Sequence, residues 1–229
     1  MSIFGRIRQA VSDYGTRGTL RIAYYRALDY RSRRRTAKYL ATFDSRFGVE
    51  TSEVVWRSNL SAVGRNKGHS TWYQPVGLIS VADIVRILKL DLAGVTFVDL
   101  GSGKGRVMFD ACQFAFRRVI GVEFSPELHE AALRNAALFS GRLWVIPEPI
   151  CADACEFSFP ADPLVVFMFN PFDGVIMKSV AANLERSLRD CPRPAYVVYV
   201  FPFQRAVFQT PRWKLVRDTG DCCMFKAVA

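Results

Sequence analysis

A glycine-rich turn at residues 97–106 is the feature of this sequence that most directly indicates chemistry. It reads Phe-Val-Asp-Leu-Gly-Ser-Gly-Lys-Gly-Arg, so that Gly101, Gly103 and Gly105 alternate with other residues after an apolar segment. Glycine lets the backbone turn tightly and lets a ligand approach where a Cβ atom would collide. The pattern predicts a ligand-binding turn between a strand and a helix, and the alternative is a turn with a structural role only.

The residues around this turn favour a cationic ligand over a dinucleotide. A dinucleotide fingerprint has the form GxGxxG, but Arg106 stands at the place of its third glycine. Asp99 precedes the turn, where a carboxylate suits a pyrophosphate poorly and suits a ligand that carries an ammonium and a sulfonium group. A nicotinamide-dependent oxidoreductase is therefore disfavoured.

Polar residues also follow the next three expected strands. Glu123 is expected to accept hydrogen bonds from both hydroxyls of a ribose, although a helix cap is the alternative, for which Ser125 is the better candidate. Asp153 is expected to accept from an adenine amino group, unless it only forms a turn. Asn170 is expected to hydrogen-bond a substrate, unless it only caps its strand.

The order of apolar segments predicts the α/β fold class. From residue 95 onward, near-continuous apolar strands alternate with helices, which indicates a parallel sheet covered on both faces. The expected strands are 96–100, 118–123, 143–150, 164–170 and 196–201, followed by two antiparallel candidates at 213–217 and 222–228. The expected helices are one from Ser80 or Asp83 to about Gly94, one from the turn through Phe116, and those at 125–139 and 175–189.

Length, composition and charge indicate one folded domain with a basic N-terminal segment. The 229 residues are 50% hydrophobic and 23% charged, which suits a single α/β core. Of the net charge of +10, residues 1–46 carry +8, from eleven Lys and Arg against three Asp. We divide the chain into a basic helical segment, 1–46, and a domain, 47–229. The segment is expected to cap the domain or to contact an anionic partner, either a nucleic acid, an acidic protein or a membrane surface.

Several other classes of protein are not expected. The six cysteines and two histidines have no spacing suited to zinc, so no metal site is predicted. The longest apolar runs are shorter than the roughly 18 to 20 residues of a membrane-spanning helix, so no transmembrane span is expected. Without an evident secretory signal, the expected location is cytoplasmic. The oligomeric state stays open.

Taken together, these residues resemble the class I S-adenosylmethionine-dependent methyltransferases. The resemblance covers residues 70–229 and implies a Rossmann-like, seven-stranded, mostly parallel sheet with helices on both faces and an antiparallel C-terminal hairpin. It implies S-adenosylmethionine as cofactor, with Glu123 at the ribose and Asp153 and Ala154 at the adenine. The residues implied to hold the methionine part are Asp99, Gly101, Ser102, Gly103 and Gly105.

Two further segments resemble narrower groups within this family. Tyr73-Gln-Pro75 and the segment GVEFSPEL resemble the seven-strand protein-lysine methyltransferases, including the histone type that acts on the nucleosome core, which implies Tyr73 and Asn170 near the cofactor. Asn170-Pro171-Phe172 resembles the Asn/Asp-Pro-Pro-aromatic motif of amino-group methyltransferases, with Phe172 in place of the second proline. That difference weakens the inference of an adenine or glutamine acceptor. The whole chain also resembles uncharacterised bacterial methyltransferase-domain proteins.

The expected catalytic residues are Asn170, Phe172 and Tyr73. The amide oxygen of Asn170 would orient an acceptor amine, and the two aromatic rings would line its channel. The leading acceptor is an amino group on a macromolecule, such as a protein lysine. Nucleic acid, a small molecule, and a non-catalytic S-adenosylmethionine-binding module remain alternatives.

Overall fold

The computed structural model describes residue 16, residues 42–53 and residues 79–228. Tyr73 and nearly all of the predicted basic segment lie outside the described residues. The described chain forms one seven-stranded sheet with the strand order β3-β2-β1-β4-β5-β7-β6. The strands are β1 (Thr96–Leu100), β2 (Arg118–Glu123), β3 (Pro147–Cys151), β4 (Leu164–Phe169), β5 (Ala195–Val200), β6 (Trp213–Asp218) and β7 (Cys222–Ala227).

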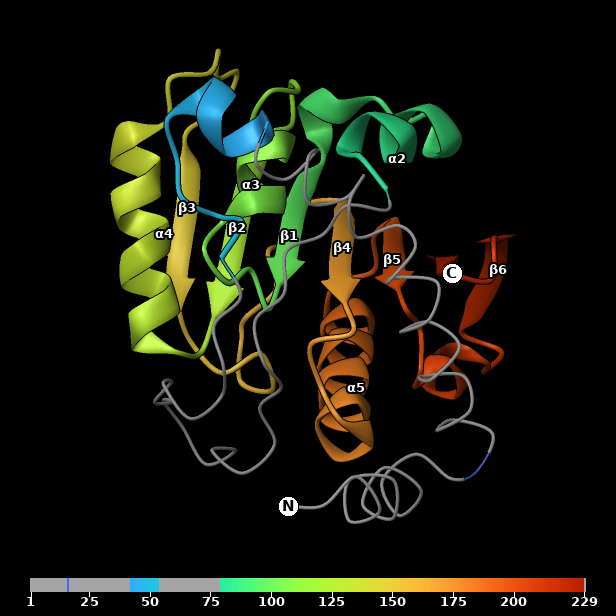
Figure 1. The fold of residues 1–229 in the computed structure, drawn as a ribbon. Coiled ribbons are helices and arrows are strands. Elements are labelled where there is room, and N and C mark those ends of the chain that lie inside the picture. The colour runs from blue at the N-terminus through green and yellow to red at the C-terminus, as the bar shows by residue number, and fades with distance from the viewer. Residues whose placement is uncertain (1–15, 17–41, 54–78, 229) are drawn as a thin grey trace.

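Strands β1 to β5 are parallel, and β7 and β6 complete one side of the sheet as an antiparallel pair. The carboxyl ends of the parallel strands therefore meet at one edge, toward which their arrowheads point in Figure 1. The predicted α/β sheet, mostly parallel with an antiparallel C-terminal hairpin, is confirmed. This edge is where open α/β sheets bind ligands.

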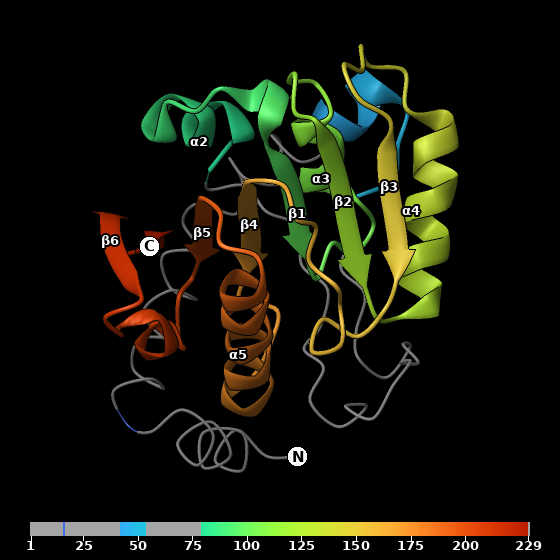
Figure 2. The same ribbon diagram turned by 180° about the vertical axis from the view of Figure 1, so that it is seen from behind.

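Apolar side chains bury both faces of the sheet. Every residue of β1, with the sequence TFVDL, is buried, and β4 has the sequence LVVFMF. One face packs on helix α5 (Gly174–Asp190), whereas the other packs on α2 (Val81–Leu88) and α3 (Arg106–Ala111). In Figure 2, β1 and β2 lie in front of α3. Two separate layers of core therefore hold the sheet rigid beneath its carboxyl edge.

Side-chain caps define where the helices begin. Ser80 caps α2 and forms a capping box with Asp83. Ser125 accepts from the Leu128 amide at the start of α4 (Pro126–Leu138), with a proline at its first position, as expected. Two short 3₁₀ segments, η3 (Leu92–Gly94) and η4 (Arg205–Phe208), complete the described elements.

Three predicted boundaries were wrong. The helix expected to run to about Gly94 ends at Leu88, where Lys89 adopts a left-handed conformation as the C-cap, and the separate 3₁₀ segment η3 follows. The helix that follows the glycine turn ends at Ala111 and does not continue through Phe116, because the carbonyl of the next residue, Cys112, accepts from the Trp144 amide at 2.8 Å. The third strand begins at Pro147, later than predicted, and the preceding Trp144 and Ile146 are exposed. Prolines are tolerated in β3 because it is an edge strand.

A helical stretch at residues 42–47 packs on the same side of the sheet as α3. Its Phe43 and Phe47 belong to that buried cluster, and the Phe47 ring stacks on Phe139 with 4.8 Å between centroids. The division of the chain predicted between residues 46 and 47 falls at the end of this stretch and stays a prediction.

None of the helices within the described ranges is long and apolar enough to cross a bilayer.

Replacing Phe167, at the centre of β4, tests this core. Its ring is 1% exposed and stacks on Phe97, so Phe167→Ala should lower the free energy of unfolding by roughly 3 to 5 kcal/mol. Val175→Ala on α5, where the side chain is 62% exposed, is the control and should change it by less than about 0.5 kcal/mol. Urea unfolding measures both, and equal effects would contradict the described core.

Candidate functional site

Three glycines after β1 adopt backbone conformations that favour glycine. Gly101, Gly103 and Gly105 have φ angles of 76°, 55° and 90°, all in the left-handed region. A Cβ atom at Gly101 would lie 2.6 Å from Cβ of Pro171, which follows β4. The turn therefore needs its glycines, and the first of them brings the turn against the Asn170-Pro171 segment.

Glu123, the last residue of β2, is tied to this turn. Its Oε2 accepts from the Gly103 amide and its Oε1 from the Ser125 amide, both at 2.9 Å, and the side chain is 5% exposed. Each carboxylate oxygen keeps capacity for a further hydrogen bond. The residue predicted to hold a ribose and the turn predicted to hold a ligand thus form one unit.

Asp99 lies close to Glu123 on the same face of the sheet. Asp99 is paired with Gly121 in the β1–β2 register, and Glu123 lies two residues after Gly121. Because side chains alternate between the faces of a strand, Asp99 and Glu123 share a face of the sheet. A Cβ atom at Gly121 would lie 2.7 Å from the sulfur of Met108 and 2.9 Å from the Ser102 hydroxyl, so glycine makes room there for both side chains.

Burial and, to a smaller extent, the charge of Glu123 raise the pKa of Asp99 to about 8, although a hydrogen bond from the Met108 backbone opposes the shift. Burial also raises the pKa of Glu123, against backbone hydrogen bonds from Ser125, Gly103 and Phe124. Within the described ranges, no Lys or Arg forms an ion pair with either acid. A bound cation would favour the charged form of both.

Two more predicted residues lie close by. Ser102 is buried, and its hydroxyl finds no hydrogen-bond partner in the described part of the chain. Asp153 follows β3 at the same edge, where the amide of the intervening Ala152 donates to the carbonyl of Glu123 at 2.9 Å. Asp153 Oδ1 accepts from the Cys155 amide, and Ala154 is buried. Asp153 therefore has the turn-forming geometry that was the alternative to a ligand-binding role.

Asn170 follows β4 with a φ of 39°, a left-handed conformation in which asparagine is one of the few tolerated side chains. Its Oδ1 accepts from the Tyr199 hydroxyl at 3.1 Å, and that hydroxyl accepts from the Gln204 amide. Phe172 is partly buried against the α5 side of the core. The amide of Asn170 is therefore held in a fixed orientation at the edge.

Sequence reasoning missed Tyr199 and Asn135. Tyr199 is fully buried, and the sequence feature that could have identified it is a hydroxyl group within the otherwise apolar strand AYVVYV. Asn135 is also buried, and the sequence feature that could have identified it is an amide on the apolar face of α4, where it links the turn to residue 50.

Among the described residues, no three His, Cys, Asp or Glu side chains are grouped so as to hold a metal ion.

No protein-family model and no curated protein matches the chain. Solved structures with a similar fold include a ribosomal protein L11 methylase from Lactobacillus delbrueckii subsp. bulgaricus, at 15% identity over 63% of this chain and 75% of that chain, with a TM-score of 0.46. A second is magnesium protoporphyrin IX methyltransferase from Synechocystis with bound SAM, at 15% identity over 65% and 77%, with a TM-score of 0.45. Identities this low show a similar fold only, so the function of this chain depends on the residues of its own site.

The carboxyl edge thus gathers every described residue predicted for the site. At or just after the carboxyl ends of adjacent parallel strands lie the turn 99–105, Glu123, Asp153, Ala154 and Asn170. This arrangement can bind a ligand that combines hydroxyl groups with positive charge. Tyr73 lies outside the described residues, so its predicted place beside the cofactor stays a prediction.

The raised pKa of Asp99 predicts how stability depends on pH. Between the ordinary value of 3.8 and about 8, the folded protein holds a proton on Asp99 that the unfolded chain has lost, so this group lowers stability as pH rises through that window. Asp99→Asn removes the effect, and its free energy of unfolding should fall less between pH 5 and pH 8 than that of the wild type. Urea unfolding across this range measures it, and parallel pH profiles would contradict the buried acid.

Proposed function

We propose that this protein is a methyltransferase that uses S-adenosylmethionine. The observation that carries the proposal is the buried pair of acids, Asp99 and Glu123, with Glu123 hydrogen-bonded to the Gly103 amide of the turn. An acid pair without a described cationic partner suits a cationic nucleoside and disfavours a pyrophosphate. A dinucleotide site would also need turn amides for its phosphates, and the Gly103 amide is already used.

The described residues fit this cofactor. Asp99 and the turn suit its methionine part, since the carboxyl is buried and the Ser102 hydroxyl has no hydrogen-bond partner among the described residues. Glu123 has oxygens for two ribose hydroxyls, and Asp153 and Ala154 suit the adenine. When bound, the cofactor supplies an electrophilic methyl group. The chain itself has to orient the acceptor and exclude water.

For the acceptor we propose an amino group on a macromolecule, such as a protein lysine. Asn170 supports this, because its amide oxygen accepts from Tyr199 at the rim beside Pro171, and an amide can make further hydrogen bonds through its NH₂ group and its second lone pair. An amide oxygen that accepts from an amine N–H would aim the lone pair of the amine. Phe172 and Tyr73 are the aromatic residues we propose for the acceptor channel.

A cytoplasmic location also belongs to this proposal. All six cysteines are free thiols, which suits a reducing compartment.

Loss of Glu123 should weaken cofactor binding. Glu123→Ala removes charge-assisted hydrogen bonds, so the affinity for S-adenosylhomocysteine should fall by about 1 to 3 kcal/mol in calorimetry. Glu130→Ala changes an exposed acid on α4 and serves as the control, with unaltered affinity expected. Unchanged binding in the Glu123 variant would reject the ribose assignment.

The reaction itself is tested with a radiolabelled methyl group. Purified protein, labelled S-adenosylmethionine and a cell lysate should yield label in protein, and Asn170→Ala should reduce the rate more than it reduces cofactor affinity. Label in nucleic acid or in small molecules would move the acceptor to that class. Absence of transfer to any fraction, with intact cofactor binding, would favour a non-catalytic module and contradict the enzymatic proposal.

We also propose that the basic N-terminus contacts an acidic macromolecule. Residues 1–41 hold ten Lys and Arg against two Asp. Their removal should weaken binding to a polyanion such as heparin and flatten its salt dependence, while calorimetry shows unchanged affinity for S-adenosylhomocysteine. If polyanion binding survives the truncation with the same salt dependence, the segment serves only as a cap.

A further inference from the structure

The glycine turn contains two positively charged side chains that are buried. Lys104 and Arg106 expose only 7% and 6% of their side chains. Arg106 is also the first residue of α3, where the positive end of the helix dipole is unfavourable to a cation. Burying these charges costs free energy unless each of them has a partner.

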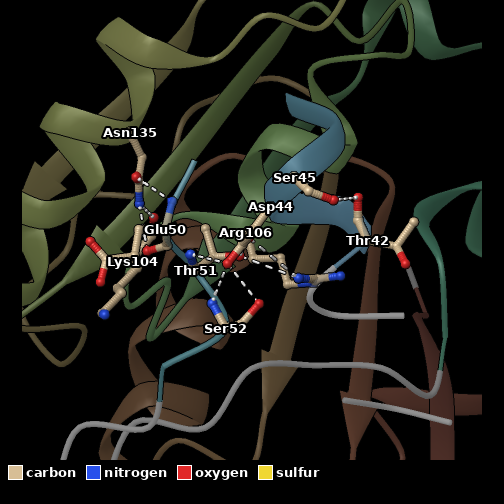
Figure 3. A network of polar contacts seen from close by, with 9 residues as sticks. All are labelled: Thr42, Asp44, Ser45, Glu50, Thr51, Ser52, Lys104, Arg106 and Asn135. Carbon is tan, nitrogen blue, oxygen red and sulfur yellow. Dashed lines mark hydrogen bonds and ion pairs between the residues drawn. The ribbon is translucent and has the colours of Figure 1, made fainter. Parts of the chain in front are cut away.

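Residues 42–53, about fifty residues earlier in the chain, provide hydrogen-bond and ion-pair partners for both side chains. Arg106 Nη1 donates to Thr51 Oγ1 at 3.2 Å and lies 3.9 Å from a carboxylate oxygen of Asp44, while its guanidinium lies over the Phe43 ring at 4.3 Å. Lys104 Nζ pairs with Glu53 Oε2 at 3.1 Å. Figure 3 shows the Thr51 and Asp44 side chains together beside Arg106.

Asp44 also fixes the shape of the segment that provides these partners. Its Oδ2 accepts from the amides of Thr51 and Ser52 and from the Ser52 hydroxyl, and its Oδ1 accepts from the Thr51 hydroxyl, all at 2.6 to 2.8 Å. One carboxylate therefore closes the loop 44–52 and at the same time faces Arg106. Charge-assisted bonds of this kind are stronger than neutral ones.

A second clamp connects this loop to the turn itself. Asn135 of α4 donates to the carbonyls of Lys104 and Glu50 at 3.0 and 3.2 Å, and its Oδ1 accepts from the Glu50 amide at 2.9 Å. The carbonyl of Lys104 lies between Gly103 and Gly105, so this clamp acts on the backbone of the turn (Figure 3).

We propose that Asp44 is a positioning residue for the cofactor site. By neutralising Arg106 and closing the loop 44–52, it holds the start of α3 and keeps the Gly103 amide aligned with Glu123. Without the carboxylate, the buried guanidinium loses this ion pair, the loop opens, and the turn shifts with them. This inference rests on the proposed function, because the turn is taken as the place where the cofactor binds.

The test compares two variants that each remove one acid. Asp44→Asn should raise the Kd for S-adenosylhomocysteine about tenfold in calorimetry and speed amide hydrogen exchange in the peptide that contains residues 99–106. Glu148→Gln breaks an ion pair with Arg118 at the opposite end of β2, where the distances are 2.6 and 2.9 Å. That control should leave both readouts unchanged.

A double-mutant cycle separates positioning from loss of general stability. If Asp44 acts through Arg106, Asp44→Asn should change the Kd less than about twofold in an Arg106→Met background. Thr51→Val, which keeps the side-chain volume, should weaken binding about threefold through loss of its hydroxyl contacts. If Asp44→Asn does not fold, Thr51→Val replaces it as the test variant.

The outcomes distinguish this inference from the proposed function. If the wild type binds S-adenosylhomocysteine and Asp44→Asn binds it equally well with unchanged exchange, Asp44 has no positioning role. An additive effect in the Arg106→Met background also overturns the proposal, because the two residues then act independently. If the wild type shows no binding, the cofactor assignment itself fails, and Asp44 can be judged only from exchange at the turn, which must still increase.

Discussion

The hydrogen bond between the Gly103 amide and the Glu123 carboxylate holds the rest of the site in place. It joins the turn after β1 to the end of β2, and it forms at 2.9 Å only because the turn adopts left-handed conformations that favour glycine. Both groups are buried, so neither bond partner can be replaced by water without cost. The position of Asp99 and the start of α3 depend on this junction.

Charge balance around the junction explains what kind of ligand fits. The turn region carries two buried acids and two buried cations. The cations Lys104 and Arg106 are matched by residues 42–53, whereas Asp99 and Glu123 have no cationic partner within the described ranges. The unmatched groups are therefore acids, and they lie where open sheets bind ligands. A nucleoside with positive charge completes the balance, while a pyrophosphate would worsen it.

Much of the fold was predictable because it depends on local patterns. The strands at 96–100 and 118–123 and the cap at Ser125 follow from apolar runs and from a serine before a proline. Periodicity did not predict the end of α3 at Ala111, because the deciding hydrogen bond comes from Trp144, distant in the sequence. The late start of β3 likewise reflects its place at the sheet edge.

The site was predictable where each residue follows a strand, since carboxyl ends of parallel strands meet at one edge. Glu123, Asp153 and Asn170 are of this kind. The role of Lys104 and the contact of Asn135 with Glu50 were not predictable, because both arise from residues 42–53 folding back over the turn. Contacts across such a separation leave no periodic signal in the sequence.

Amide hydrogen exchange in the peptide covering residues 97–106, with and without S-adenosylhomocysteine, tests directly whether the ligand binds between Gly103 and Glu123. A ligand seated between Gly103 and Glu123 should slow exchange in this peptide and leave the β6–β7 hairpin unaffected, and NAD at the same concentration should have no effect. Equal exchange with and without S-adenosylhomocysteine, or protection by NAD instead, would contradict the account.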